Sequence, residues 1–309
     1  MMCLIGIDLG GTNIKSGLVS DSGELLVSAV CATPAREGAD AILRQLREAT
    51  RHCLHEARGR GLTPVAIGLA TAGWVSPATG KVISASDNLT GWTGAEPGRV
   101  LREACGLPVT LINDAHAVAV AEWHFGAAKG VDDFLCVTLG TGAGAGAYVG
   151  GRLHQGAHDM ANAIGHLQIE ADGLPCACGK HGCLQPYANA AALMRYAGDR
   201  FSSATDLIRA AGDGDQQALA AIGVLARWLA RGCALAIHLL DPAMLILAGG
   251  LTQNNPALPI ALQQELAGML LSPGLRRLEV RVSPLGYMAG VIGAAAAARE
   301  RMEKAERQE

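Results

Sequence analysis

The sequence carries little excess charge of either sign and few aromatic residues. Its 309 residues have a formal net charge of -3, and only 4% of them are Phe, Trp or Tyr. Proteins that bind nucleic acid through phosphate contacts normally present a basic patch. Here the basic residues are scattered, so we expect no nucleic-acid partner. The chain is instead half hydrophobic with 40 glycines, which is typical of an α/β protein rich in tight turns, and its length allows two domains.

The sequence also lacks a hydrophobic run of the ~20 residues that a membrane-spanning helix needs. The run at 234–250 comes nearest, but His238, Asp241 and Pro242 interrupt it. The first residues lead directly into an expected strand, without the basic segment or the small-residue cleavage site of a secretory signal. We therefore expect no membrane partner and a cytoplasmic location.

Disulfide bonds are not expected in that compartment, although the sequence has nine cysteines. Six are scattered singly among apolar neighbours, but Cys176, Cys178 and Cys183 form a cluster rich in glycine. Three thiolates and a fourth ligand would hold a tetrahedral zinc ion of the structural kind, with no open position for catalysis. The alternative is a reduced turn without metal. The histidines near enough in the sequence to supply the fourth ligand are His154, His158, His166 and His181.

Two segments about 130 positions apart share one pattern of a strand, a glycine-rich turn and a second strand. They span residues 4–19 and 135–149. Their turns contain Gly10-Gly11-Thr12 and Gly140-Thr141-Gly142. Glycine lets backbone amides approach an anion closely, and a threonine hydroxyl adds a donor. Two such turns in successive domains indicate a phosphate chain that is held from both sides of a cleft.

The remaining pattern predicts two α/β lobes. We expect strands at 4–9, 15–20, 25–31, 65–70, 109–112 and 244–248, and helices at 38–60, 115–125, within 189–240 and at 289–306. The expected lobes are residues 1–115 and residues 116–288, the second including a zinc-binding segment at 166–183. The helix at 289–306 could return to the first lobe.

Two aspartates lie where buried strands end. Asp8 ends the first strand and faces the first glycine turn. A buried carboxylate there is costly unless it binds something, and a magnesium ion on phosphate oxygens would suit it; the alternative is that it accepts hydrogen bonds from the turn amides. Asp114 follows Asn113 at the start of a helix, so it could cap that helix. It could equally act as the general base that deprotonates a hydroxyl during phosphoryl transfer, and we favour this hypothesis.

These residues together resemble the ROK family of bacterial sugar kinases and sugar-responsive repressors. The resemblance runs from about residue 4 to 298 in matching order. It rests on Asp8-Leu9-Gly10-Gly11-Thr12, Asn113-Asp114, Leu139-Gly140-Thr141-Gly142, Gly165-His166 and Cys176-x-Cys178-Gly179-x-x-Gly182-Cys183. It implies the two-lobed actin-like, ribonuclease-H-like ATPase fold, a homodimer, and an ATP- and magnesium-dependent kinase acting on a small-molecule sugar.

The resemblance also implies a role for individual residues. Asp114 would be the catalytic base. ATP and its magnesium would be bound by Asp8, Gly10, Gly11, Thr12, Gly140, Thr141, Gly142, Gly144, Gly249 and Gly250. The sugar would contact Thr71, Gly73, Asn88, Asn113, Asp114 and His166. Structural zinc would be bound by His166, Cys176, Cys178 and Cys183.

Three positions depart from the usual pattern of the sugar kinases. Ala163 and Gln185 each replace a glutamate that contacts sugar hydroxyls in the family, and Thr71-Ala72-Gly73 stands where its glucokinases usually have Pro-Gly. We therefore expect phosphorylation, at C6, of N-acetylmannosamine or of a hexose other than glucose. The alternatives are a glucokinase and a catalytically weak sugar sensor. The repressors have a DNA-binding helix-turn-helix before the first strand, where this chain has three residues, so we do not expect a repressor.

Overall fold

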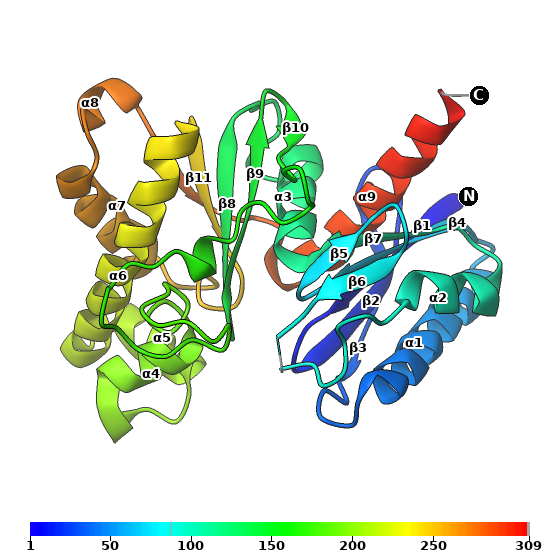
Figure 1. Cartoon of the computed structure of the whole chain (residues 1–309), viewed down its shortest axis with the longest axis horizontal. Helices are drawn as coiled ribbons and strands as arrows, with labels where there is room; N and C mark the ends of the chain where they lie inside the picture. Colours follow the sequence, from blue (N-terminus) through cyan, green and yellow to red (C-terminus); the bar gives the residue numbers. More distant parts are fainter. Residues whose placement is uncertain (87, 308–309) are drawn as a thin grey trace. The chain divides into compact units, whose positions relative to one another are not determined.

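The computed structural model describes residues 1–86 and 88–307, and they form two α/β units (Figure 1). Unit 1 comprises residues 1–126, 156–160 and 288–307, and unit 2 comprises residues 127–155 and 161–287. The expected division at residue 115 differs from this one. Helix α3 (Asp114–Phe125) belongs to unit 1 because it packs along the C-terminal helix α9 (Ala289–Glu306).

Unit 1 is built on a five-stranded sheet with the order β3-β2-β1-β4-β7. Strands β1, β2 and β3 form an antiparallel meander, and β4 and β7 continue the sheet parallel to β1. The strands are β1 (Met2–Leu9), β2 (Asn13–Val19), β3 (Leu25–Ala32), β4 (Thr63–Thr71) and β7 (Val109–Asn113), with a separate ribbon of β5 (Trp74–Ser76) and β6 (Lys81–Ser84). The helices of this unit, besides α3 and α9, are α1 (Ala39–Gly59) and α2 (Pro97–Cys105).

Glycine allows the alanine-rich helix α9 to pack directly on the sheet of unit 1. A Cβ atom on Gly6 of β1 would lie 2.1 Å from the carbonyl oxygen of Val291, and one on Gly68 of β4 would lie 1.8 Å from that of Ala294. Real Cβ atoms do not approach so closely, so both positions require glycine. The register of the parallel strands then places Thr71 beside both Leu9 and Asn113, which brings the ends of β1, β4 and β7 to one edge of the sheet.

Unit 2 repeats this plan with the strand order β10-β9-β8-β11-β12. Its central strand β8 pairs antiparallel with β9 and parallel with β11, as β1 does with β2 and β4. The strands are β8 (Phe134–Leu139), β9 (Ala143–Val149), β10 (Arg152–Leu153), β11 (Met244–Ala248) and β12 (Glu279–Val282). The helices are α4 (Ala190–Ala197), α5 (Ala204–Gly212), α6 (Gln216–Leu240), α7 (Ala257–Met269) and α8 (Pro273–Arg276), with short 3₁₀ turns η1 (Ile164–His166), η2 (Gly198–Arg200) and η3 (Gly286–Met288).

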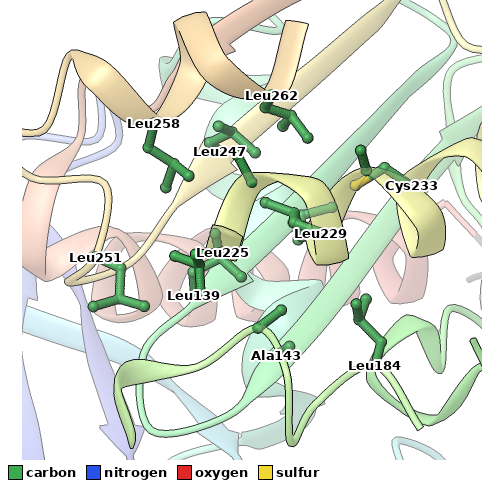
Figure 2. Close-up of a cluster of buried hydrophobic side chains, with 14 of the residues drawn as sticks. Leu139, Ala143, Leu184, Leu225, Leu229, Cys233, Leu247, Leu251, Leu258 and Leu262 are labelled. Atoms are coloured by element: carbon green, nitrogen blue, oxygen red, sulfur yellow. The ribbon is translucent and has the colours of Figure 1, made fainter. Parts of the chain in front are cut away.

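Helix α6 forms the centre of the hydrophobic core of unit 2. It is long and apolar enough to span a membrane, but 56% of its most apolar window is buried inside the protein. Figure 2 shows its Leu225 and Leu229 within a cluster that also contains Leu139 of β8 and Leu247 of β11. The hydropathy of α6 is therefore accounted for by packing against its own sheet.

Candidate active site and metal centre

An ion pair joins the first two strands of unit 1 beside the first glycine turn. Asp8 and Lys15 are cross-strand partners, and Lys15 Nζ lies 2.6 Å from Asp8 Oδ2 with both side chains largely buried. A Cβ atom on Gly290 would lie 2.5 Å from the same Oδ2, so the carboxylate lies against the first turn of α9. The positive end of a helix dipole favours a negative charge there. Lys15 is a site residue that was not predicted from the sequence, although the hairpin register places it opposite Asp8.

The first glycine turn is fixed by hydrogen bonds at both ends and is open in the middle. The Gly10 amide donates to the carbonyl of Asn13 (3.0 Å), and the Thr33 hydroxyl donates to the carbonyl of Gly10 (2.7 Å). Gly11 and Thr12 are exposed, and no heavy atom lies within 4 Å of where a Gly11 Cβ would be. A ligand can therefore approach the backbone of this turn closely, as an anion-binding turn requires.

Asn113, rather than Asp114, caps helix α3. The Asn113 Oδ1 atom accepts hydrogen bonds from the amides of Ala115 (3.0 Å) and His116 (3.1 Å), and its Nδ2 donates to the carbonyl of Gly73 (2.9 Å). Asp114 lies one residue further on, in the first turn, where its Oδ1 accepts from the Ala115 amide (2.9 Å). The capping alternative for Asp114 is thus wrong, because its neighbour already has that role.

The Asp114 carboxyl is half-buried and titrates well above its usual range. Burial is the main cause, the negative charge of Asp8 adds to it, and together they raise the pKa of Asp114 to about 6. The Ala115 amide and the charge of Lys15 act in the opposite direction. A pKa near the working pH suits a general base, because the group is then ionised at neutral pH and still accepts a proton readily.

The other residues of unit 1 that were predicted to bind sugar are Gly73, Asn88 and Thr71, and they differ in their burial and in their hydrogen-bond partners. Gly73 lies next to Asn113, and its φ of +93° together with a Cβ position 2.5 Å from the Ser84 carbonyl oxygen requires glycine. Asn88 is exposed. Thr71 is fully buried, and its hydroxyl accepts from Trp92 Nε1 (2.9 Å) and donates to the Ala72 carbonyl (3.2 Å). The Thr71 hydroxyl is therefore already paired inside the protein, unlike the direct sugar contact that we expected.

The second glycine turn and the Gly249-Gly250 pair lie side by side in unit 2. The Gly140 amide donates to the carbonyl of Gly142 (3.0 Å), which closes the turn and leaves Thr141 exposed. Gly249 follows β11 with a φ of +96°, and its Cβ would lie 2.3 Å from the carbonyl oxygen of Leu139. Gly144 lies just beyond the turn in β9, opposite Thr138. The residues that the sequence assigned to ATP in this unit are thus adjacent in space.

One histidine and three cysteines in unit 2 form a cluster of metal-ligand geometry. One ligand atom from each of His166, Cys176, Cys178 and Cys183 lies within 4.8 Å of the others. The Cys178 and Cys183 sulfurs are 3.7 Å apart, as are the Cys176 sulfur and His166 Nδ1. Tetrahedral zinc with ordinary bond lengths requires about 3.8 Å between sulfurs and about 3.6 Å between sulfur and nitrogen. The cluster therefore fits zinc, and among the candidate histidines it is His166 that completes it.

The backbone around the cluster needs glycine at the turns. Gly179 and Gly182 have φ values of +84° and +69°, and a Cβ on Gly182 would lie 1.6 Å from the Glu170 carbonyl oxygen. Burial, and after it the neighbouring Cys178 thiol, raises the pKa of Cys183 to about 12. Burial likewise raises the pKa of Cys176, whereas the pKa of Cys178 is lowered. A divalent cation stabilises all three groups as thiolates. The donor set and its surroundings thus favour a bound cation.

Comparison with known proteins shows which family the chain belongs to. The family model described as ROK family matches residues 4–301. The chain belongs to the ROK family. It is 32% identical to a glucokinase of Streptomyces coelicolor over 96% of this chain and 97% of that protein. It is 27% identical to an N-acetylmannosamine kinase of Salmonella typhi, with 95% and 97% covered.

A solved structure agrees with this assignment. The crystal structure of a ROK family glucokinase from Streptomyces griseus in complex with glucose and AMPPNP is 32% identical to this chain, with a TM-score of 0.88. It covers 96% of this chain and 99% of its own. The resemblance inferred from the motifs is therefore confirmed, and the ROK family protein has the actin-like two-lobed α/β fold, with a cluster of Cys and His side chains able to bind a metal.

Proposed function

We propose that this ROK family protein is an ATP-dependent sugar kinase that transfers the γ-phosphoryl group to the C6 hydroxyl of a hexose or N-acetylhexosamine. The observation that carries the proposal is the environment of Asp114. It is a half-buried carboxyl group with a pKa of about 6, within the electrostatic influence of the Asp8–Lys15 pair, and Asp8 lies at the same edge of the sheet. Phosphoryl transfer to a hydroxyl needs a base of this kind beside a phosphate-binding group.

The other site residues of unit 1 have separate roles around that base. Asp114 takes the proton from the attacking hydroxyl, and Asn113, whose side chain is fixed by the helix cap and by Gly73, holds the loop that presents it. Asp8 is the residue suited to magnesium, directly or through water, and the ion would neutralise charge on the phosphate oxygens. The first glycine turn binds phosphate through its exposed residues Gly11 and Thr12, beside Gly10, whose amide is already bonded to the Asn13 carbonyl. The matching turn of unit 2 at 140–142 also binds phosphate.

The metal centre has a structural role in this proposal, and the ion is zinc. Cys176, Cys178, Cys183 and the Nδ1 atom of His166 complete a tetrahedral set without an open position. Ligation through Nδ1 keeps the remaining ring proton of His166 on Nε2, which makes that atom a hydrogen-bond donor. His166 can then donate to a sugar hydroxyl while its other nitrogen binds the metal.

The substrate that we propose is N-acetylmannosamine or a hexose other than glucose. Ala163 and Gln185 lack the carboxylates with which ROK sugar kinases usually bind sugar hydroxyls, and losing one charged acceptor typically costs ~1.5–3 kcal/mol. The methyl side chain of Ala163 would also leave space for a bulkier substituent. A glucokinase remains the second candidate, because the chain is 32% identical to one and 27% identical to an N-acetylmannosamine kinase. A cytoplasmic homodimer is also part of the proposal.

The pH dependence of the reaction should report Asp114. Its pKa is raised to about 6, so the base is ionised above that pH and protonated below it. We expect kcat/KM for the sugar, measured with saturating magnesium-ATP, to be level above pH 7 and to fall about tenfold per unit below pH 6. A profile that stays level down to pH 5 would contradict this assignment of the base.

The substrate is tested by measuring ADP release with magnesium-ATP on a panel of sugars. The panel contains glucose, mannose, fructose, allose, N-acetylglucosamine and N-acetylmannosamine. We expect the highest kcat/KM on N-acetylmannosamine or on a hexose other than glucose. A preference for glucose would support the glucokinase candidate instead. Absence of turnover with every sugar, using folded and zinc-loaded protein, would indicate a sugar sensor.

A further inference from the structure

The side chain of Gln185 lies against the second glycine turn. Its Oε1 atom accepts a hydrogen bond from the Ala143 amide at 3.5 Å. A Cβ atom on Gly142 would lie 3.0 Å from the same oxygen, so the amide group covers this residue of the turn. Gln185 comes only two residues after the metal ligand Cys183. One side chain thus lies between the metal centre and the turn.

Backbone contacts from the same region hold the turn at other points. The Gly165 carbonyl accepts from the Gln185 amide (2.9 Å), and a Cβ on Gly165 would lie 2.1 Å from the carbonyl oxygen of Ala143. The Ala190 amide donates to the Gly140 carbonyl (2.9 Å). Gly165 directly precedes the ligand His166, and Gln185 follows the ligand Cys183 by two residues. Segments close to two metal ligands therefore both contact Ala143 at the end of the turn.

The hydrophobic core fixes the flanks of these segments. Leu139 and Ala143, which border the turn, are buried in the same cluster as Leu184, which precedes Gln185 (Figure 2). The flanks cannot shift without disturbing that packing, whereas the exposed residues between them, such as Thr141, have no such anchor. The conformation of the turn itself therefore depends on its polar contacts.

We infer that Gln185 is a positioning residue that holds the phosphate-binding turn at 140–143 and links it to the metal centre. This inference rests on the proposed function insofar as the turn binds ATP. The amide oxygen of Gln185 is the acceptor that pairs with the Ala143 amide, so this side chain contributes to nucleotide binding through the turn.

Hydrogen exchange tests the contact without requiring any enzymatic activity. In the zinc-loaded protein without nucleotide, Gln185→Ala should raise the exchange rate of the Ala143 amide about fivefold, the effect of losing one ordinary hydrogen bond. Gln217→Ala is the matched control, because Gln217 also makes a side-chain bond to backbone, to the Ala197 carbonyl at 2.8 Å. It should leave exchange at 140–143 unchanged. Unchanged exchange in Gln185→Ala would overturn the inference.

Measurements of ligand binding then distinguish a role of Gln185 in positioning the turn from a direct contact of Gln185 with the sugar. Gln185→Ala should weaken binding of a non-hydrolysable ATP analogue about three- to tenfold and leave KM for the sugar and the zinc content unchanged. Gln185→Glu keeps an oxygen that can accept from the Ala143 amide, so it should bind the analogue nearly as well as the wild-type protein does. A raised sugar KM with normal nucleotide affinity in Gln185→Ala, or a loss of nucleotide binding in Gln185→Glu as large as that in Gln185→Ala, would overturn the inference. If exchange changes but no variant or wild-type protein phosphorylates a sugar, the contact stands and the proposed function fails.

Discussion

Replacing Asp114 by Asn is expected to lower kcat by about 10²–10⁴-fold while leaving the affinity for ATP nearly unchanged. The substitution keeps the size of the side chain and an oxygen that can accept from the Ala115 amide, as Asp114 Oδ1 does at 2.9 Å. It removes only the capacity to take a proton. The loss should therefore appear in kcat at saturating sugar, measured by ADP release, and not in nucleotide binding measured by calorimetry.

The same substitution should not destabilise the protein at neutral pH. Burial raises the pKa of Asp114 from 3.8 to about 6, so the folded state holds this proton more tightly than the unfolded state. The free energy of unfolding must then fall as the pH rises from about 4 to 6, and above pH 6 the whole cost of the buried charge is present. A shift of about two units corresponds to about 3 kcal/mol. An asparagine avoids that cost, so we expect the melting temperature to stay level or rise.

A control variant tests whether replacing an aspartate by an asparagine at a similar position elsewhere affects activity. Asp206 also lies in the first turn of a helix, α5 of unit 2, where it is half-buried and pairs with Arg209. Asp206→Asn should therefore retain full activity. If Asp114→Asn kept more than about a tenth of the wild-type turnover, Asp114 would not be the base.

The sequence predicted those parts of the site that are encoded locally. The two glycine turns, the strand ends at Asp8 and Asn113, and the cysteine spacing each occupy a short segment, and each lies where the pattern indicated. These segments can be recognised in the sequence because each needs particular residue types, such as glycine where two backbone segments approach closely. The choice of His166 as the fourth ligand came from the resemblance, because spacing alone allowed several histidines.

The features that the sequence did not predict depend on contacts between distant segments. Helix α3 joins unit 1 because a Cβ on Gly293 would lie 1.7 Å from the Ala117 carbonyl oxygen, a contact across more than 170 residues. The pairing of the Thr71 hydroxyl with Trp92, and the position of Gln185 over Gly142, are equally non-local. Patterns of hydropathy and spacing describe a segment and its immediate neighbours, so they carry no signal for such pairs.

Removing the metal should lower the melting temperature of unit 2 far more than that of unit 1. The cluster joins the segment that carries His166 to the loop at 176–183, in addition to backbone hydrogen bonds such as those from the Ile169 and Glu170 amides to the Gly182 carbonyl. The binding free energy of a structural zinc ion is coupled to folding and reaches about 10 kcal/mol or more in small zinc domains. Here the fold has its own core, so we expect a drop of many degrees and not complete unfolding. Calorimetry before and after chelation measures it, with metal analysis to confirm the loss.

Cys178→Ser is the variant that separates loss of the metal from loss of packing. Cys178 is the exposed cysteine of the cluster, whereas Cys176 and Cys183 are buried, so a serine at 178 leaves no cavity in the core. It should reproduce the destabilisation caused by chelation, and chelation should then have no further effect. Cys31→Ser in unit 1 is the control, because Cys31 lies outside the cluster and its contact with Gln45 can be kept by a hydroxyl. An unchanged melting temperature after complete removal of zinc would show that the metal has no structural role, and the cysteine cluster would then need another explanation.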